Sequence, residues 1–184
     1  MIRVFMTALL LVLSACAKTD ASNSIDEGDA QASPSKKASA EILGIDGKRL
    51  GLVFLQETPN GVILSASFKG VPEGEHAFHI HSIGSCEPDF SAAGSHFSPY
   101  GKKHGFKVAG GSHAGAMPNF YVPASGEATF DVFNDKVSFL GAPNSLFDDD
   151  GSAIIVHEGP DDYESQPSGA AGSRIGCGVI EVAQ

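Results

Sequence analysis

Short apolar runs, bounded by glycine, proline and asparagine, follow one another along the chain from residue 39 onward. Some of them alternate strictly, as where Val62, Leu64, Ala66 and Phe68 are separated by single residues of another kind. Side chains of a strand alternate between the two faces of a sheet, so this period of two predicts β-strands. We expect eight strands, over residues 48–57, 62–68, 76–82, 119–122, 127–133, 136–140, 153–157 and 178–182.

The connections between these segments favour an antiparallel fold. Asn60-Gly61 separates two of the runs, and this dipeptide is a strong signal for a β-hairpin. No segment keeps a helical period over three turns, so the sequence predicts an all-β antiparallel sandwich or barrel. Two connections, residues 83–116 and 158–174, are too long for simple turns, and long loops in compact domains usually have a function.

The N-terminal residues are typical of an export signal. Residues 1–15 hold one basic residue, Arg3, followed by an apolar run and then small residues, the layout of a secretory signal peptide. The apolar run is shorter than the roughly 20 residues that span a membrane as a helix. Leu13-Ser14-Ala15-Cys16 resembles a bacterial lipobox, so Cys16 is expected to carry a lipid. An ordinary cleaved signal peptide is the alternative.

Residues 16–38 contain almost no large apolar side chains, and we expect a flexible tether that cannot bury enough surface to fold. Residues 39–184 then form a single domain of ordinary size. This domain has 18 Asp and Glu residues against 8 Lys and Arg, a net charge of -10. A nucleic-acid-binding surface needs basic residues, so the charge excludes nucleic acid as an expected partner.

Three cysteines are present, and one of them, Cys16, is assigned to the lipid. Cys86 and Cys177 remain, and the oxidising environment outside the cytoplasm favours a disulfide between them. Two free buried thiols are one alternative. Metal ligation is another, although the two residues lack the C-x-x-C spacing of most metal-binding cysteines.

All seven histidines fall between His76 and His157. Within a strand, His79 and His81 would project to the same side, whereas His76 would project to the other side. Further histidines follow through Gly-rich sequence and at the end of another apolar run: His96, His104, His113 and His157. Imidazoles gathered on strands and loops suit copper and zinc, so the spacing predicts a site for two metal ions.

These motifs together resemble the copper/zinc superoxide dismutases, in particular their secreted bacterial branch. The resemblance is carried by HAFHIH, by the intervals between the later histidines, by VHEGPDD and by the C-terminal GSRIGCGVI. It covers residues 39–184. It implies an eight-stranded antiparallel Greek-key β-barrel with two long functional loops. It also implies dismutation of superoxide to oxygen and hydrogen peroxide by copper cycling between Cu(II) and Cu(I).

The resemblance implies two sets of metal ligands, with His96 shared as a bridging imidazolate. The copper ligands are His79, His81, His96 and His157, and the zinc ligands are His96, His104 and His113. The fourth zinc ligand of the family is an aspartate, and here that position is Ala116. We therefore expect weaker and less selective zinc binding. Asp161 matches the family's aspartate that hydrogen-bonds one copper and one zinc histidine.

Arg174 matches the family's active-site arginine, which holds the anion beside copper, and His96 is expected to carry a proton while detached from copper. Because the domain is acidic, attraction of superoxide must be local. We expect that attraction from Lys102, Lys103 and Lys107.

A copper-binding or copper-storage protein on the same fold is the alternative function, motivated by Ala116. An adhesive lipoprotein with the same scaffold would not require the histidines. The expected location is the cell envelope, on the periplasmic side of the outer membrane, with membrane contact through the lipid of Cys16 only. Bacterial relatives include monomers and dimers, so a homodimer remains open.

Overall fold

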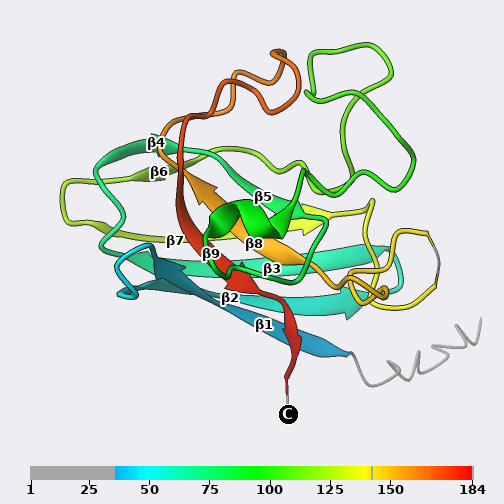
Figure 1. Ribbon diagram of the computed structural model, residues 1–184, viewed down its shortest axis with the longest axis horizontal. Helices are drawn as coiled ribbons and strands as arrows, with labels where there is room; N and C mark the ends of the chain where they lie inside the picture. Colours follow the sequence, from blue (N-terminus) through cyan, green and yellow to red (C-terminus); the bar gives the residue numbers. More distant parts are fainter. Residues whose placement is uncertain (1–35, 142, 184) are drawn as a thin grey trace, which may run out of the picture. The chain divides into compact units, whose positions relative to one another are not determined.

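The computed structural model describes residues 36–141 and 143–183, and there the helices and strands are β-strands apart from one short 3-10 helix (Figure 1). The strands are β1 (Lys37–Gly44), β2 (Arg49–Thr58), β3 (Gly61–Lys69), β4 (Gly74–His76), β5 (Phe78–His81), β6 (Phe120–Val122), β7 (Glu127–Asn134), β8 (Ala153–His157), β9 (Arg174–Val179) and β10 (Glu181–Val182). A short 3-10 helix, η1, covers Phe90–Ala93. None of the described helices could span a membrane.

β2 and β3 form the hairpin that Asn60-Gly61 predicts. They pair antiparallel from Thr58 opposite Gly61 to Gly51 opposite Phe68. Gly61 has a φ of 142°, and a Cβ atom there would lie 2.4 Å from the carbonyl oxygen of Asn134. The turn therefore needs glycine. Buried residues alternate with exposed ones along β3, which confirms the period of two.

The main sheet has the strand order β5-β8-β9-β1-β2-β3-β7, and β10 pairs with β1. Its strand pairings are antiparallel. β9, near the end of the chain, lies beside β1. β7 pairs with β3, although three strands, β4, β5 and β6, lie between them in the sequence. A late strand that returns beside an early one is Greek-key connectivity. The all-β Greek-key fold with two long loops is therefore confirmed.

β4 and β6 form a second, two-stranded sheet. β4 and β5 are separated by Ala77 alone, so the single strand expected over residues 76–82 is present as two short pieces in two sheets. This division and the short β10 raise the number of strands above the expected eight. Ala77 hydrogen-bonds outside both ladders, its N–H donating to the oxygen of Gly159 and its oxygen accepting from the N–H of His157.

Every residue of β5 and β8 is buried, which places the H-x-H segment in the interior. Phe78 and Ile80 belong to the main hydrophobic core. Side chains alternate along the strand, so His79 and His81 face the other side. That side is covered by the long loops, which Figure 1 shows next to each other beyond the strand ends and which hydrogen bonds join.

Two expectations about strands were wrong. Residues 136–140 form no strand, although Val137 and Phe139 are buried. Their alternation reflects burial at the edge of the core, and Phe139 N–H donates to a side chain, Glu57 Oε1, instead of joining a ladder. β1 was not expected, because its inward residues Ala38 and Ala40 are too small to mark an apolar period.

β1 begins at Lys37, two residues before the expected start of the domain at residue 39. Ala38 is fully buried and belongs to the hydrophobic core. The expected signal peptide at 1–15, Cys16 and the tether up to residue 35 lie outside the described residues.

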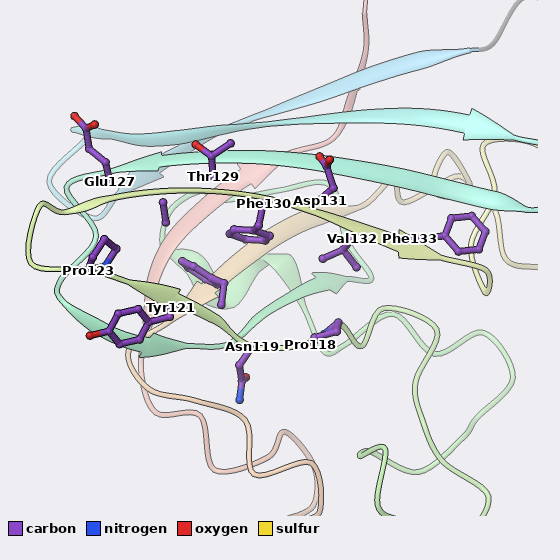
Figure 2. Close-up of a pocket in the computed structure, with 12 residues that line it drawn as sticks. Pro118, Asn119, Tyr121, Pro123, Glu127, Thr129, Phe130, Asp131, Val132 and Phe133 are labelled. Carbon is purple, nitrogen blue, oxygen red and sulfur yellow. The ribbon is translucent and has the colours of Figure 1, made fainter.

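A groove separates β6 from β7, which follow each other in the chain but do not pair (Figure 2). The ring of Phe130 stacks on that of Phe120 across the two strands, with centroids 4.9 Å apart. Tyr121 and Phe133 lie at its exposed rim. No histidine lines this groove, so it is separate from the candidate site.

Candidate metal centre

Four histidines from three parts of the chain converge at one point. His79 and His81 come from β5, His157 ends β8, and His96 follows η1 in the first long loop. One ring nitrogen of each lies within 4.8 Å of the corresponding nitrogens of the other three. The convergence follows from strand register, because Phe78 pairs with Val156 and thereby brings His157 next to the H-x-H pair.

A second group of three histidines shares one member with the first. The ring nitrogens of His96, His104 and His113 also lie within 4.8 Å of one another. Nδ1 of His113 and Nδ1 of His96 are 3.3 Å apart. His96 therefore offers one nitrogen to each group, which is the arrangement that a bridging imidazolate requires.

Unpaired ring nitrogens show which atoms are available to metal ions. Among the described residues, the buried ring nitrogens without a hydrogen-bond partner are His79 Nδ1, His81 Nε2, His96 Nε2, His104 Nδ1 and His157 Nε2. Each buried unsatisfied polar atom costs about 1–3 kcal/mol, so four in the four-histidine group and one in the three-histidine group call for a partner in each group. Imidazole nitrogens suit copper and zinc, and both groups therefore fit the metals that the sequence predicts.

Burial keeps these imidazoles neutral. Burial, together with the positive charge of Arg174, lowers the pKa of His81 to about 3 and that of His157 to about 4. Burial also lowers the pKa values of His79 and His96. A neutral imidazole has a free lone pair, so the four-histidine group is ready to bind a cation at neutral pH.

Asp161 contacts both groups. Its Oδ2 accepts a hydrogen bond from His79 Nε2 and its Oδ1 accepts one from His104 Nε2, both at 2.9 Å. Burial alone would raise the pKa of Asp161, but these bonds and the N–H of Tyr163 outweigh it and lower the pKa to about 2. The carboxylate thus stays ionised and leaves Nδ1 of each histidine free.

Arg174 begins β9 and is fixed by backbone carbonyls. Its Nη1 donates to the oxygen of Phe90, and its Nη2 donates to the oxygen of Gly94 at 2.7 Å. The Gly94 oxygen also contacts His81 Nδ1 at 3.0 Å. The guanidinium is therefore held close to the four-histidine group as a fixed positive charge.

The expected disulfide is confirmed, because Cys86 and Cys177 are bonded across 91 residues. It joins β9 to the loop that contains η1. Phe90 and Ala93 of η1 pack with Cys177 and Ile155 in a small cluster of buried residues. The disulfide thus stabilises the segment whose carbonyls hold Arg174.

Ala116 is buried close to the two histidine groups, but its side chain offers no atom that could bind a metal ion. Its backbone forms an isolated β-bridge with His79, and its N–H contacts the oxygen of His113 at 3.3 Å. Within residues 36–141 and 143–183, no carboxylate joins the three-histidine group as a fourth member.

His76 lies apart from both groups, as its position on the opposite strand face predicts. Its Nδ1 contacts the oxygen of His157 and its Nε2 contacts the oxygen of Pro72, both at 2.9 Å. The three lysines expected to attract superoxide are exposed residues of the first long loop: Lys102, Lys103 and Lys107. Lys107 Nζ is already engaged, since it donates to the oxygen of Asp162 at 3.0 Å.

Sequence reasoning missed the residues that join the long loops: Asn119, Tyr163 and Gln166. Asn119 Nδ2 donates to the backbone oxygen of Asp161, and Asn119 Oδ1 accepts from the backbone N–H of Asp161. These contacts link positions 42 residues apart, so no local pattern marks them.

Comparison with known proteins agrees with this geometry. The family model "copper/zinc superoxide dismutase (SODC)" matches residues 50–180, which is more than half of the chain. The chain belongs to the copper/zinc superoxide dismutase family. Its substrate is accordingly superoxide, and its cofactors are copper and zinc.

Relatives match over most of their length. The chain is 48% identical to superoxide dismutase [Cu-Zn] 2 of Aquifex aeolicus over 147 residues, 78% of this chain and 86% of that protein. It is 41% identical to superoxide dismutase [Cu-Zn] of Caulobacter vibrioides over 148 residues, 78% and 85% of the two chains. The crystal structure of a SOD-like protein from Bacillus subtilis is similar, with a TM-score of 0.73, 36% identity and coverage of 77% and 96%.

Proposed function

We propose that this dismutase acts at the four-histidine group, with copper held by His79, His81, His96 and His157 and zinc by His96, His104 and His113. The observation that carries the proposal is the convergence of free, buried imidazole nitrogens at one point. Copper, when bound, supplies the alternation between Cu(II) and Cu(I) that converts two superoxide anions and two protons to oxygen and hydrogen peroxide.

Arg174 is proposed to hold the superoxide anion next to the copper ligands. The two carbonyls that fix its guanidinium prevent the side chain from following the anion into solvent. A fixed charge stabilises a bound anion without further reorganisation.

His96 is proposed to deliver a proton. Its Nδ1 faces the three-histidine group, so Nε2, while it is detached from copper, can hold a proton that is then donated to the departing peroxide.

The disulfide supports a location outside the cytoplasm, since such bonds persist in oxidising compartments. We place the enzyme in the cell envelope, on the periplasmic side of the outer membrane. It would be held there by lipid on Cys16, after removal of signal residues 1–15 and with the residues between Cys16 and β1 as a tether. The acidic charge supports the absence of a nucleic-acid partner. Monomer and homodimer are both compatible with this proposal.

A copper-binding or copper-storage protein is the second candidate, and Ala116 is the observation that favours it. A site without the zinc carboxylate could bind copper yet lack the rigid bridge at His96. The fixed position of Arg174 favours the enzyme instead, because a storage site does not need a cation that holds an anion.

Metal analysis combined with a superoxide dismutation assay distinguishes the two. The purified protein is loaded with copper and zinc and compared with His157→Ala, which removes one copper ligand. We expect bound copper and dismutation in the wild type and a loss of both in the variant. Copper bound to the wild type without dismutation would instead support the storage protein.

A further inference from the structure

The three-histidine group lacks the carboxylate that the family places at the position of Ala116. With one ligand fewer, the binding free energy of a zinc ion at this site is smaller. The remaining ligands then have to be held in place by the protein itself if the site is to keep its affinity. His104 is held in this way, by hydrogen bonds to its backbone and to its ring.

The side chain of Gln166 clasps the backbone of His104. The N–H of His104 donates to Gln166 Oε1 at 3.0 Å, and Gln166 Nε2 donates to the oxygen of His104 at 2.9 Å. The same Nε2 also donates to the oxygen of Glu164 at 2.9 Å, which fixes the orientation of the amide. The clasp connects the two long loops at a metal ligand, across 62 residues of sequence.

Tyr163 extends this connection. The N–H of Lys107 donates to the oxygen of Tyr163 at 3.1 Å, and the Tyr163 hydroxyl accepts from the N–H of Asn119 at 2.6 Å. The approach is close, because a Cβ atom at Gly105 would lie 2.1 Å from the Tyr163 oxygen. The residue after His104 must therefore be glycine for the loops to meet.

The ring of His104 is oriented separately. Its Nε2 donates to Asp161 Oδ1, and Nδ1 stays buried and free for a metal ion. Backbone and ring of this ligand are thus both held by protein groups alone. His113 differs, since it is only partly buried and its Nδ1 lies 3.3 Å from the Nδ1 of another candidate ligand, His96.

We propose that Gln166 is a positioning residue of the three-histidine site, and that its hydrogen bonds to His104 preserve zinc affinity in the absence of a carboxylate at position 116. This inference rests on the proposed function for the identity of the ion. If it is correct, the effect of Gln166 on zinc affinity should become smaller when a fourth zinc ligand is restored at position 116.

The test compares Gln166→Met with Gln56→Met in the purified full-length protein. Both replacements keep side-chain length and remove the amide, but Gln56 is an exposed residue of β2, outside the long loops. Zinc affinity is measured by chelator competition, and Co(II) absorption serves as a spectroscopic probe of the same site. His113→Ala, which removes a ligand, identifies the part of each signal that comes from the three-histidine group.

We expect Gln166→Met to lower zinc affinity by about tenfold, the lower end of the effect of residues that orient metal ligands. Gln56→Met should leave it unchanged. In the Ala116→Asp background the same Gln166→Met change should cost at most about threefold, because the added carboxylate holds the ion independently. An equal loss in both backgrounds, or no loss in the Ala116 protein, would overturn the proposal.

A measurement without metal provides a second check. The His104 N–H should exchange with solvent faster in metal-free Gln166→Met than in metal-free Gln56→Met, and unchanged exchange would also overturn the proposal. These results do not depend on catalysis. An inactive copper-loaded wild type would refute the proposed function, whereas the comparison of affinities would still decide the role of Gln166.

Discussion

Asp161 Oδ2 accepts a hydrogen bond from His79 Nε2 at 2.9 Å, and both side chains are almost completely buried. The other carboxylate oxygen accepts from His104. One carboxylate therefore orients a histidine of the four-histidine group and a histidine of the three-histidine group. Loss of this residue should weaken both metal sites together.

Asp161→Asn tests this coupling. An amide cannot accept at both of its ends, so one of the two histidines loses its partner, and we expect copper and zinc affinities to fall by about 10–100-fold. The neighbouring Asp162→Asn is the control, because Asp162 is exposed and its carboxylate accepts from Glu164 and Ser165, neither of which is a candidate metal ligand. Equal metal affinities for the two variants in chelator competition would contradict the coupling.

Gly169→Ala should disturb the same contact by steric means. A Cβ atom at Gly169 would lie 1.8 Å from Asp161 Oδ1 and 2.7 Å from His104 Nε2. Gly101→Ala is a matched control, since the φ values are 72° and 60° but nothing lies within 4 Å of a Cβ at Gly101. We expect zinc affinity to fall at least about tenfold for Gly169→Ala only. Similar affinities for both would show that the loop simply moves aside.

The disulfide should contribute strongly to stability. It closes a loop of 91 residues, and the double variant Cys86→Ser, Cys177→Ser should lose about 2–5 kcal/mol of unfolding free energy in urea titrations. Reductant should destabilise the wild type by a similar amount and leave the double variant unchanged. A destabilisation of the double variant by reductant would mean that the effect does not come from this bond.

The loop lysines are expected to aid the approach of superoxide. Neutralising Lys102, Lys103 and Lys107 as glutamines should lower kcat/KM severalfold at low ionic strength, with a smaller difference as salt screens the charges. A variant with Lys37, Lys48 and Lys69 neutralised has the same net charge and serves as the control. Rates equal to wild type at every salt concentration would rule out steering by the loop lysines.

The metal-free protein should lose stability as pH falls below about 6.5. His81 and His157 have pKa values of about 3 and 4 in the folded chain against an ordinary value of 6.5. Between these values the unfolded chain binds protons that the folded chain does not, so protons favour unfolding. Two such histidines give a slope of up to about 2.7 kcal/mol per pH unit.

Asp161 adds to the loss only in stronger acid. Its folded pKa is lowered to about 2, so its contribution is complete above its ordinary value of 3.8 and disappears as pH falls through the folded value. Urea unfolding of chelator-treated protein at about pH 7.5, 6 and 5 measures the histidine effect. A free energy of unfolding that does not change over this range would contradict the burial of neutral imidazoles.

Local patterns were sufficient for much of this protein. A strand's period of two is visible in the sequence, so β3 and its hairpin, the H-x-H pair on β5 and the long loops could all be predicted. The histidine intervals and the C-terminal GSRIGCGVI segment also supported the resemblance to copper/zinc superoxide dismutases, and that resemblance implied the candidate ligands and Arg174. Two cysteines outside the lipobox were likewise enough to propose the disulfide that Cys86 and Cys177 form.

Other features depended on the folded chain because they arise from contacts between distant residues. Residues 136–140 alternate like a strand, yet they join no ladder of the sheets: Phe139 N–H donates to Glu57 Oε1, and Ser138 forms only an isolated bridge with Ser145. The clasp between Gln166 and His104 spans 62 residues, and the bond between Asp161 and His79 spans 82. A hydrogen bond across such a distance imposes no period on the residues between, so only the packing of the two loops reveals it.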